Sequence, residues 1–67
     1  MAENQRQAAE PLFFSIKDAT LILDASRTTL YAEIAAGRLR ATKRGRRTLI
    51  SRRAVEDYAA LLERDAS

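Results

Sequence analysis

The sequence predicts a small domain that is mostly α-helical and carries one small β-hairpin. Apolar side chains recur with helical spacing in three segments, and each of these segments follows a serine that can cap a helix. Between the last two segments, basic residues are interleaved with apolar and β-branched ones around a glycine, as in two strands joined by a tight turn. Together these observations predict the order helix, turn, helix, hairpin, helix.

Length and composition limit the chain to one small globular domain. It has 67 residues, of which 46% are hydrophobic, so it can form a core, although a small one. The absence of cysteine and histidine removes disulfides, thiolate zinc sites and the most common general base. No apolar run reaches the roughly 20 residues of a membrane span, and no signal peptide is evident. We therefore expect a cytoplasmic, nucleoid-associated protein with no membrane contact, no metal and no cofactor.

Residues 1–11 are expected to form a flexible N-terminal arm, because they are polar and end at Pro11, which cannot continue a helix. The apolar residues that follow are predicted to be an extended lead-in. The first helix is predicted to begin after Ser15, an N-cap with Asp18 three residues on, and to end near Asp24. Its apolar stripe consists of Ile16, Ala19, Thr20 and Leu23.

The second helix is predicted over residues 26–36. Ser26 can serve as its N-cap, and Gly37 can close it in the left-handed conformation. About three residues separate this helix from the first, so the two must cross at a steep angle, as in a helix-turn-helix motif. The residues expected to face the core are Ala25, which can also contact Leu30 across the cap, Leu30 and Ile34, with Ala35 near them.

Residues 38–53 contain eight basic side chains and no acidic one, whereas the segments on both sides are net acidic. Blocks of like charge are often disordered tails, but strand-forming and apolar residues are interleaved here with the arginines. Gly45 lies midway, where a tight hairpin requires positive φ. We therefore predict a folded wing over residues 38–50 whose charges project outward. The residues expected to hold it against the helices are Leu39, Ala41 and Ile50.

The third helix is predicted to begin at Ser51, an N-cap, with Ile50 and Val55 as a hydrophobic staple. Glu56 and Asp57 are expected on its outer face. The predicted folded domain therefore spans residues 12–63, and residues 64–67 are expected to fray. The apolar stripe of this helix consists of Val55, Tyr58, Ala59 and Leu62.

This order of elements is that of a winged helix-turn-helix, and four stretches of sequence match a known family. They are "SIKDATLIL", "ASRTTLYAEIAAGRL", "KRGRRTLIS" and "AVEDYAALL". Over residues 15–62 the chain resembles the excisionase-type, MerR-like DNA-binding domains. It departs from the family pattern at Asp24, where glycine is usual, and at Arg44, where an apolar wing residue is usual.

The resemblance implies a sequence-specific protein that binds double-stranded DNA. It implies either a recombination directionality factor, which bends DNA beside an integrase, or a small transcriptional regulator. The residues do not separate these two roles. An integrase and a second copy bound on an adjacent site are the protein partners that the resemblance suggests. No small-molecule effector domain is expected, because five residues follow Leu62.

The physical chemistry of DNA recognition agrees with this resemblance. With helix 26–36 in the major groove, its first residues reach base edges, and Arg27 can bind guanine with two hydrogen bonds. The arginines of the wing are suited to phosphates and to a narrow minor groove. The candidate contacts of the helix are Ser26, Arg27, Thr28 and Tyr31. Those of the wing and its flank are Arg38, Arg40, Lys43, Arg44, Arg46 and Arg47, with Arg52 and Arg53 as further phosphate candidates.

Simpler roles and other functions stay open at this stage. The helix cap alone can account for Ser26, and partial packing of its ring in the core can account for Tyr31. Arg52 and Arg53 can be solvated surface residues. A protein-interaction module is an alternative, with Phe13 and Leu21 as exposed apolar contacts. An RNA-binding module is another, although none of the four aromatic residues lies in the basic segment. An enzyme is not expected, since the chain has no histidine, cysteine or glycine-rich phosphate loop.

Overall fold

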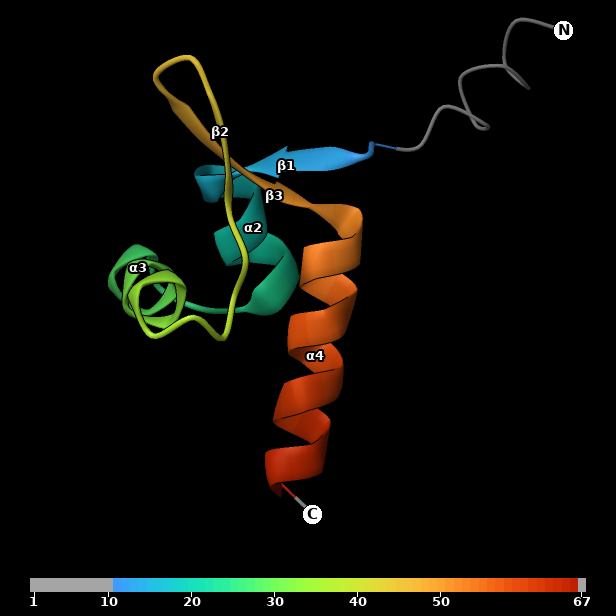
Figure 1. Ribbon diagram of the computed structural model, residues 1–67. Coiled ribbons are helices and arrows are strands. Elements are labelled where there is room, and N and C mark those ends of the chain that lie inside the picture. The colour runs from blue at the N-terminus through green and yellow to red at the C-terminus, as the bar shows by residue number, and fades with distance from the viewer. Residues whose placement is uncertain (1–10, 67) are drawn as a thin grey trace, which may run out of the picture.

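The computed structural model describes residues 11–66, which form three helices and one three-stranded antiparallel sheet (Figure 1). The fold class predicted from the sequence is confirmed, with one more strand than expected. The N-terminal arm predicted over residues 1–11 lies outside the described residues except for Pro11. In chain order the elements are β1 (Phe13–Ser15), α2 (Ile16–Leu23), α3 (Arg27–Ala35), β2 (Thr42–Arg44), β3 (Arg47–Ser51) and α4 (Arg52–Ala66).

β1 is the segment for which the sequence predicted only an extended lead-in. It pairs antiparallel with β3, with Phe14 opposite Ile50, and β3 therefore lies between β1 and β2 in the sheet. The backbone N–H of Arg52 also donates to the carbonyl of Leu12 at 2.8 Å. A strand of three residues is too short to show a two-residue alternation, so the sequence carried little sign of it. The pairing joins the start of the domain to the end of the hairpin.

The two helices of the helix-turn-helix begin and end where the sequence predicted. The hydroxyls of Ser15 and Ser26 each accept the backbone N–H three residues on, at 3.1 and 3.0 Å. Asp24 ends α2 with a left-handed φ of 53°, and Gly37 follows α3 with a φ of 81°. These local signals coincide with the ends of both helices.

The β2–β3 hairpin is confirmed and is shorter than the predicted wing. Its strands cover residues 42–51, whereas residues 38–41 lead into it without forming a strand. Arg44 lies opposite Arg47, which leaves a two-residue turn in which Gly45 has a φ of 61°. Positive φ at the first of two turn residues is the pattern of a type II′ turn, whose twist matches that of the strands.

The core lies where α2, α3, β3 and α4 meet. Leu30, Leu39 and Ile50 are its largest fully buried side chains. Phe14, Leu23, Ala25, Ile34 and Leu61 pack against it from positions that are partly buried. The buried members of the cluster are Ile16, Ala19, Leu30, Leu39, Ile50, Ala54, Val55 and Tyr58.

Three positions expected at the core were predicted wrongly. Ala35 is exposed because it lies on the side of α3 away from Leu30. Ala41 is exposed because it directly precedes β2, an edge strand whose residues are all exposed. Leu62 is 40% exposed, since α4 turns the neighbouring Leu61 toward the core instead.

α4 begins after Ser51, whose hydroxyl accepts the N–H of Ala54 at 3.0 Å, as predicted. It continues through Ala66 and so includes residues 64–66 of the segment that was expected to fray. Glu63, Arg64 and Ala66 are good helix formers, and Arg64 in the last turn interacts favourably with the helix dipole. Neither α4 nor any other helix within residues 11–66 has the length and apolarity needed to cross a membrane.

We predict that Asp24→Gly raises the free energy of unfolding by about 0.5–1 kcal/mol. The left-handed conformation is strained for aspartate and free for glycine, and a carboxylate at a helix C-terminus opposes the dipole. Urea unfolding at neutral pH measures the change. The matched control is Asp24→Ala, which removes the charge but keeps the strain. Any gain in its free energy of unfolding should therefore come from removal of the charge alone. A loss of stability in Asp24→Gly would contradict the assignment of strain to this position.

Candidate nucleic-acid interface

The outer face of α3 presents the residues predicted to contact DNA. Leu30 directs one side of the helix into the core, so Arg27, Thr28 and Tyr31 lie on the exposed side. The guanidinium carbon of Arg27 lies 5.6 Å from the centroid of the Tyr31 ring, within the range of a cation–π contact. This contact restrains a long cationic side chain on the exposed face, and it reduces the rotamer freedom that binding a base would remove.

Ser26 is engaged in the cap of α3. Its hydroxyl accepts the N–H of Thr29 at 3.0 Å and donates to the Thr29 hydroxyl at 2.9 Å. Both residues are exposed. The cap accounts for the serine at this position, and it leaves Ser26 at the end of α3 where a helix N-terminus attracts phosphate.

The β2–β3 hairpin carries a second group of predicted contacts. Its basic side chains are exposed, and within residues 11–66 none of them pairs with a carboxylate. The Lys43 amine lies 3.4 Å from the Thr48 hydroxyl, a long contact that leaves its charge uncompensated. In Figure 1 the hairpin tip and α3 both lie to the left of α4. We call the exposed basic side chains of the β2–β3 hairpin the hairpin cations. They are Lys43, Arg44, Arg46 and Arg47.

Two other predicted contacts are bound to carboxylates of the protein itself. Arg40 forms an ion pair with Asp57 of α4, at 2.6 Å between Nη2 and Oδ2. Both side chains are more than half exposed, so solvent weakens this pair. Arg38 pairs with Glu33 at 2.8 Å. These two arginines therefore differ from the hairpin cations in already having an anionic partner.

Arg52 and Arg53 lie away from the hairpin tip. They begin α4, directly after β3, and hence at the end of that strand opposite the Gly45 turn. Arg53 is exposed and Arg52 is partly buried. The structure therefore does not bring these two predicted contacts together with Arg46.

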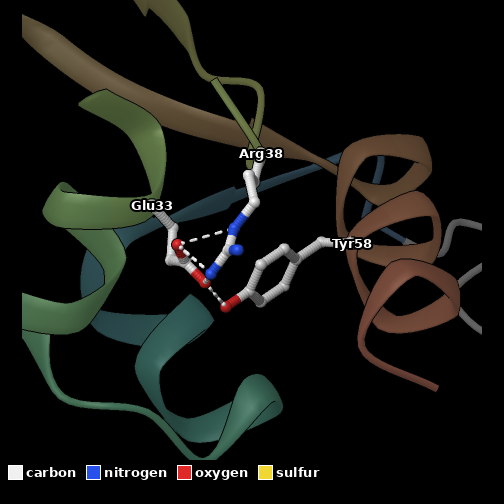
Figure 2. A network of polar contacts seen from close by, with 3 residues as sticks. All are labelled: Glu33, Arg38 and Tyr58. Carbon is white, nitrogen blue, oxygen red and sulfur yellow. Dashed lines mark hydrogen bonds and ion pairs between the residues drawn. The ribbon is translucent and has the colours of Figure 1, made fainter. Parts of the chain in front are cut away.

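Glu33 is a residue of this surface that the sequence reasoning missed. It is the one acidic residue among residues 26–53, and its side chain is only 12% exposed. Figure 2 shows its carboxylate between Arg38 and Tyr58. Nε and Nη2 of Arg38 donate to it at 2.8–3.0 Å, and the Tyr58 hydroxyl donates to Oε2 at 2.6 Å. The isolated acid was a signal in the sequence, but Tyr58 lies 25 residues away and no local pattern connects the two.

The charges of this network stabilise one another. Hydrogen bonds from Arg38 and then from Tyr58 hold the pKa of Glu33 below its usual range. The hydrogen bond to Glu33 raises the pKa of Arg38, and burial together with the bond to Glu33 raises that of Tyr58. Glu33 is therefore ionised and Tyr58 neutral at neutral pH. The network contains one carboxylate, and within residues 11–66 no cluster of His, Cys, Asp or Glu side chains is suited to hold a metal ion.

Comparison with known protein families gives a match. The model of a family described as a helix-turn-helix domain matches residues 13–60, which is most of the chain. The matched region runs from β1 into α4 and contains α3, the hairpin and Glu33. It is consistent with the resemblance to excisionase-type domains over residues 15–62. No curated protein and no solved structure matches the sequence.

We predict that the contribution of Glu33 to stability disappears in acid. Its pKa is lower in the folded state than in the unfolded chain, so ionised Glu33 favours folding above the unfolded value of about 4.5. This contribution is lost as the pH falls through the folded pKa. Parent and Glu33→Gln should therefore differ most in free energy of unfolding at neutral pH and converge as the pH falls through the folded pKa, which lies below 4.5. Urea unfolding across this range measures the difference, and a gap that does not depend on pH would exclude an ionic role for Glu33.

Proposed function

The chain belongs to the helix-turn-helix domain family of DNA-binding proteins, and from this premise we propose that it binds double-stranded DNA sequence-specifically. The observation that carries the proposal is the presence, in one domain, of two elements that each expose at least one cationic side chain. One is the face of α3 with Arg27 stacked on Tyr31, and the other is the hairpin with its uncompensated charges. An α-helix fits the major groove, and an extended arginine-rich segment fits the backbone and the minor groove.

In this proposal α3 reads bases in the major groove. Arg27 forms two hydrogen bonds with guanine O6 and N7, the most common specific contact of arginine. Thr28, on the same face, contacts a thymine methyl or a phosphate. Tyr31 donates to a phosphate, and Ser26 donates to another by exchanging its bond to the Thr29 hydroxyl. Both contacts hold the helix in register, because such contacts position a protein without reading sequence.

The hairpin cations contact the sugar–phosphate backbone and the adjacent minor groove. Arg46 occupies the turn and so reaches furthest into the groove. We leave Arg38 and Arg40 out of this set because each already has a carboxylate partner. Arg53 is exposed at the other end of β3 and is suited to a phosphate outside the segment that the hairpin covers.

Two biological roles fit this binding mode, as a recombination directionality factor that bends DNA beside an integrase or as a small transcriptional regulator. Cooperation with an integrase belongs to the first role, whereas cooperation with a second copy on an adjacent site fits either role. Genome-wide footprinting separates them, since bound sites gather at an attachment locus in one case and at promoters in the other. Competition between duplex DNA and structured RNA tests the alternative of an RNA-binding module, which would favour the RNA.

We predict that binding to duplex DNA depends steeply on salt. If each of the hairpin cations neutralises one phosphate, and α3 adds about one more, the slope of log K against log salt is about −4 to −5. Fluorescence anisotropy with a labelled duplex between 50 and 200 mM salt, about the range in which such slopes are measured, gives this value. The control is Arg46→Ala, whose slope should be shallower by about 0.9. A parent slope shallower than about −2 would contradict the phosphate contacts.

We predict that Arg27→Ala relaxes the preference at one base position. Loss of a bidentate contact to guanine should cost about 1–3 kcal/mol on the preferred duplex and much less on duplexes with another base there. Selection from a randomised duplex pool, followed by sequencing, measures the preference at every position. Lys43→Ala is the control, because loss of a phosphate contact weakens all sequences about equally. An unchanged preference profile in Arg27→Ala would mean that α3 is not the helix that reads bases.

A further inference from the structure

Glu33 connects three segments of the protein through both its backbone and its side chain. Its backbone carbonyl accepts the N–H groups of Arg38 and Leu39, at 3.0 and 3.2 Å. Its carboxylate binds the Arg38 guanidinium and the Tyr58 hydroxyl (Figure 2). A single residue of α3 thus fixes the chain where it leaves that helix toward the hairpin, and it also bonds to α4.

The two charges of this connection are not equally accessible. The Arg38 side chain is 50% exposed, so without a partner its guanidinium would be free to bind a phosphate. Glu33, at 12% exposure, has little solvent to replace Arg38, and an unpaired carboxylate there is unfavourable. Nε and Nη2 of Arg38 are held by Glu33, so only Nη1 can reach a phosphate without breaking these hydrogen bonds. Glu33 therefore compensates the charge of one cation of the basic segment and weakens its attraction to DNA.

We propose that Glu33 is a positioning residue that raises the selectivity of the protein for its DNA site. A mobile cation strengthens binding to every duplex alike, because phosphates carry no sequence information. A fixed angle between α3 and the hairpin strengthens only the duplex whose base edges meet α3 while the hairpin reaches the backbone. By holding Arg38, Glu33 removes the binding that a mobile cation would add on every duplex. By holding the chain that follows α3, it keeps the fixed angle that favours the matching duplex. This inference rests on the DNA-binding function proposed above.

The central experiment compares the parent with Glu33→Gln on two labelled duplexes. One is the tightest duplex that the parent selects from a randomised pool, and the other is a scrambled duplex of the same length and composition. Release of Arg38 should steepen the salt slope on the scrambled duplex by about 0.9, one additional phosphate. Affinity for the scrambled duplex should rise several-fold at low salt. The ratio of the two affinities should fall, because the selected duplex gains the phosphate contact but loses the fixed geometry.

Three further variants separate the causes. Glu33→Gln combined with Arg38→Gln has the net charge of the parent, so its salt slope should return to the parent value while its selectivity stays low. Glu56→Gln raises the net charge as Glu33→Gln does, at an exposed side chain outside the network, and should keep the parent selectivity. Tyr58→Phe removes only the bond between Glu33 and α4, and it should lower selectivity without changing the slope.

The outcomes distinguish this inference from the proposed function. A parent that does not prefer the selected duplex would overturn the proposed function itself. A parent with clear preference, together with a folded Glu33→Gln that keeps the parent's affinity ratio and salt slope, would overturn the role of Glu33 alone. Circular dichroism establishes that each variant is folded. If Glu33→Gln does not fold, the charge-balanced double variant replaces it, and parent-like selectivity there would equally overturn the proposal.

Discussion

Both elements of the proposed DNA-binding surface depend on one small core. Leu30 of α3, Leu39 after it and Ile50 of β3 are fully buried in the same cluster, so the helix, the lead-in to the hairpin and the central strand are fixed at a shared point. A chain of this size has no second core to hold a misplaced element. The polar side chains that surround the cluster keep their directions only while these three residues remain packed.

Much of this fold follows from local signals in the sequence. The serine caps and the turn at Gly45 are short-range features, and the structure has them where the sequence predicted them. The left-handed Asp24 ends α2 where that helix was expected to end. The parts that the sequence did not predict depend on distant partners. β1 exists because β3, more than thirty residues on, offers it an edge, and the choice of Leu61 over Leu62 depends on how α4 packs.

The candidate site also has parts that could be predicted from the sequence and parts that could not. The exposed face of α3 could be predicted by elimination, since Leu30 and Ile34 had to face the core. The hairpin cations were predictable because the turn directs them outward. The partners of Arg38 and Arg40 were not, because they lie on α3 and α4, and a list of basic residues does not say which of them already has an anion beside it.

The basic segment therefore carries less available charge than its sequence suggests, and this difference has a physical use. Uncompensated cations on an exposed hairpin bind any duplex. They raise the affinity and make it depend steeply on salt concentration, but they give no sequence specificity. Cations with internal partners stabilise the angle between elements, and in the proposed complex this angle lets α3 meet base edges while the hairpin meets phosphate. Glu33 stands where these two uses meet. Its carboxylate binds Arg38, which would otherwise be an uncompensated cation, and makes it a cation with an internal partner. In our proposal a single acidic residue in the basic region thereby lowers affinity for any duplex and raises selectivity for one.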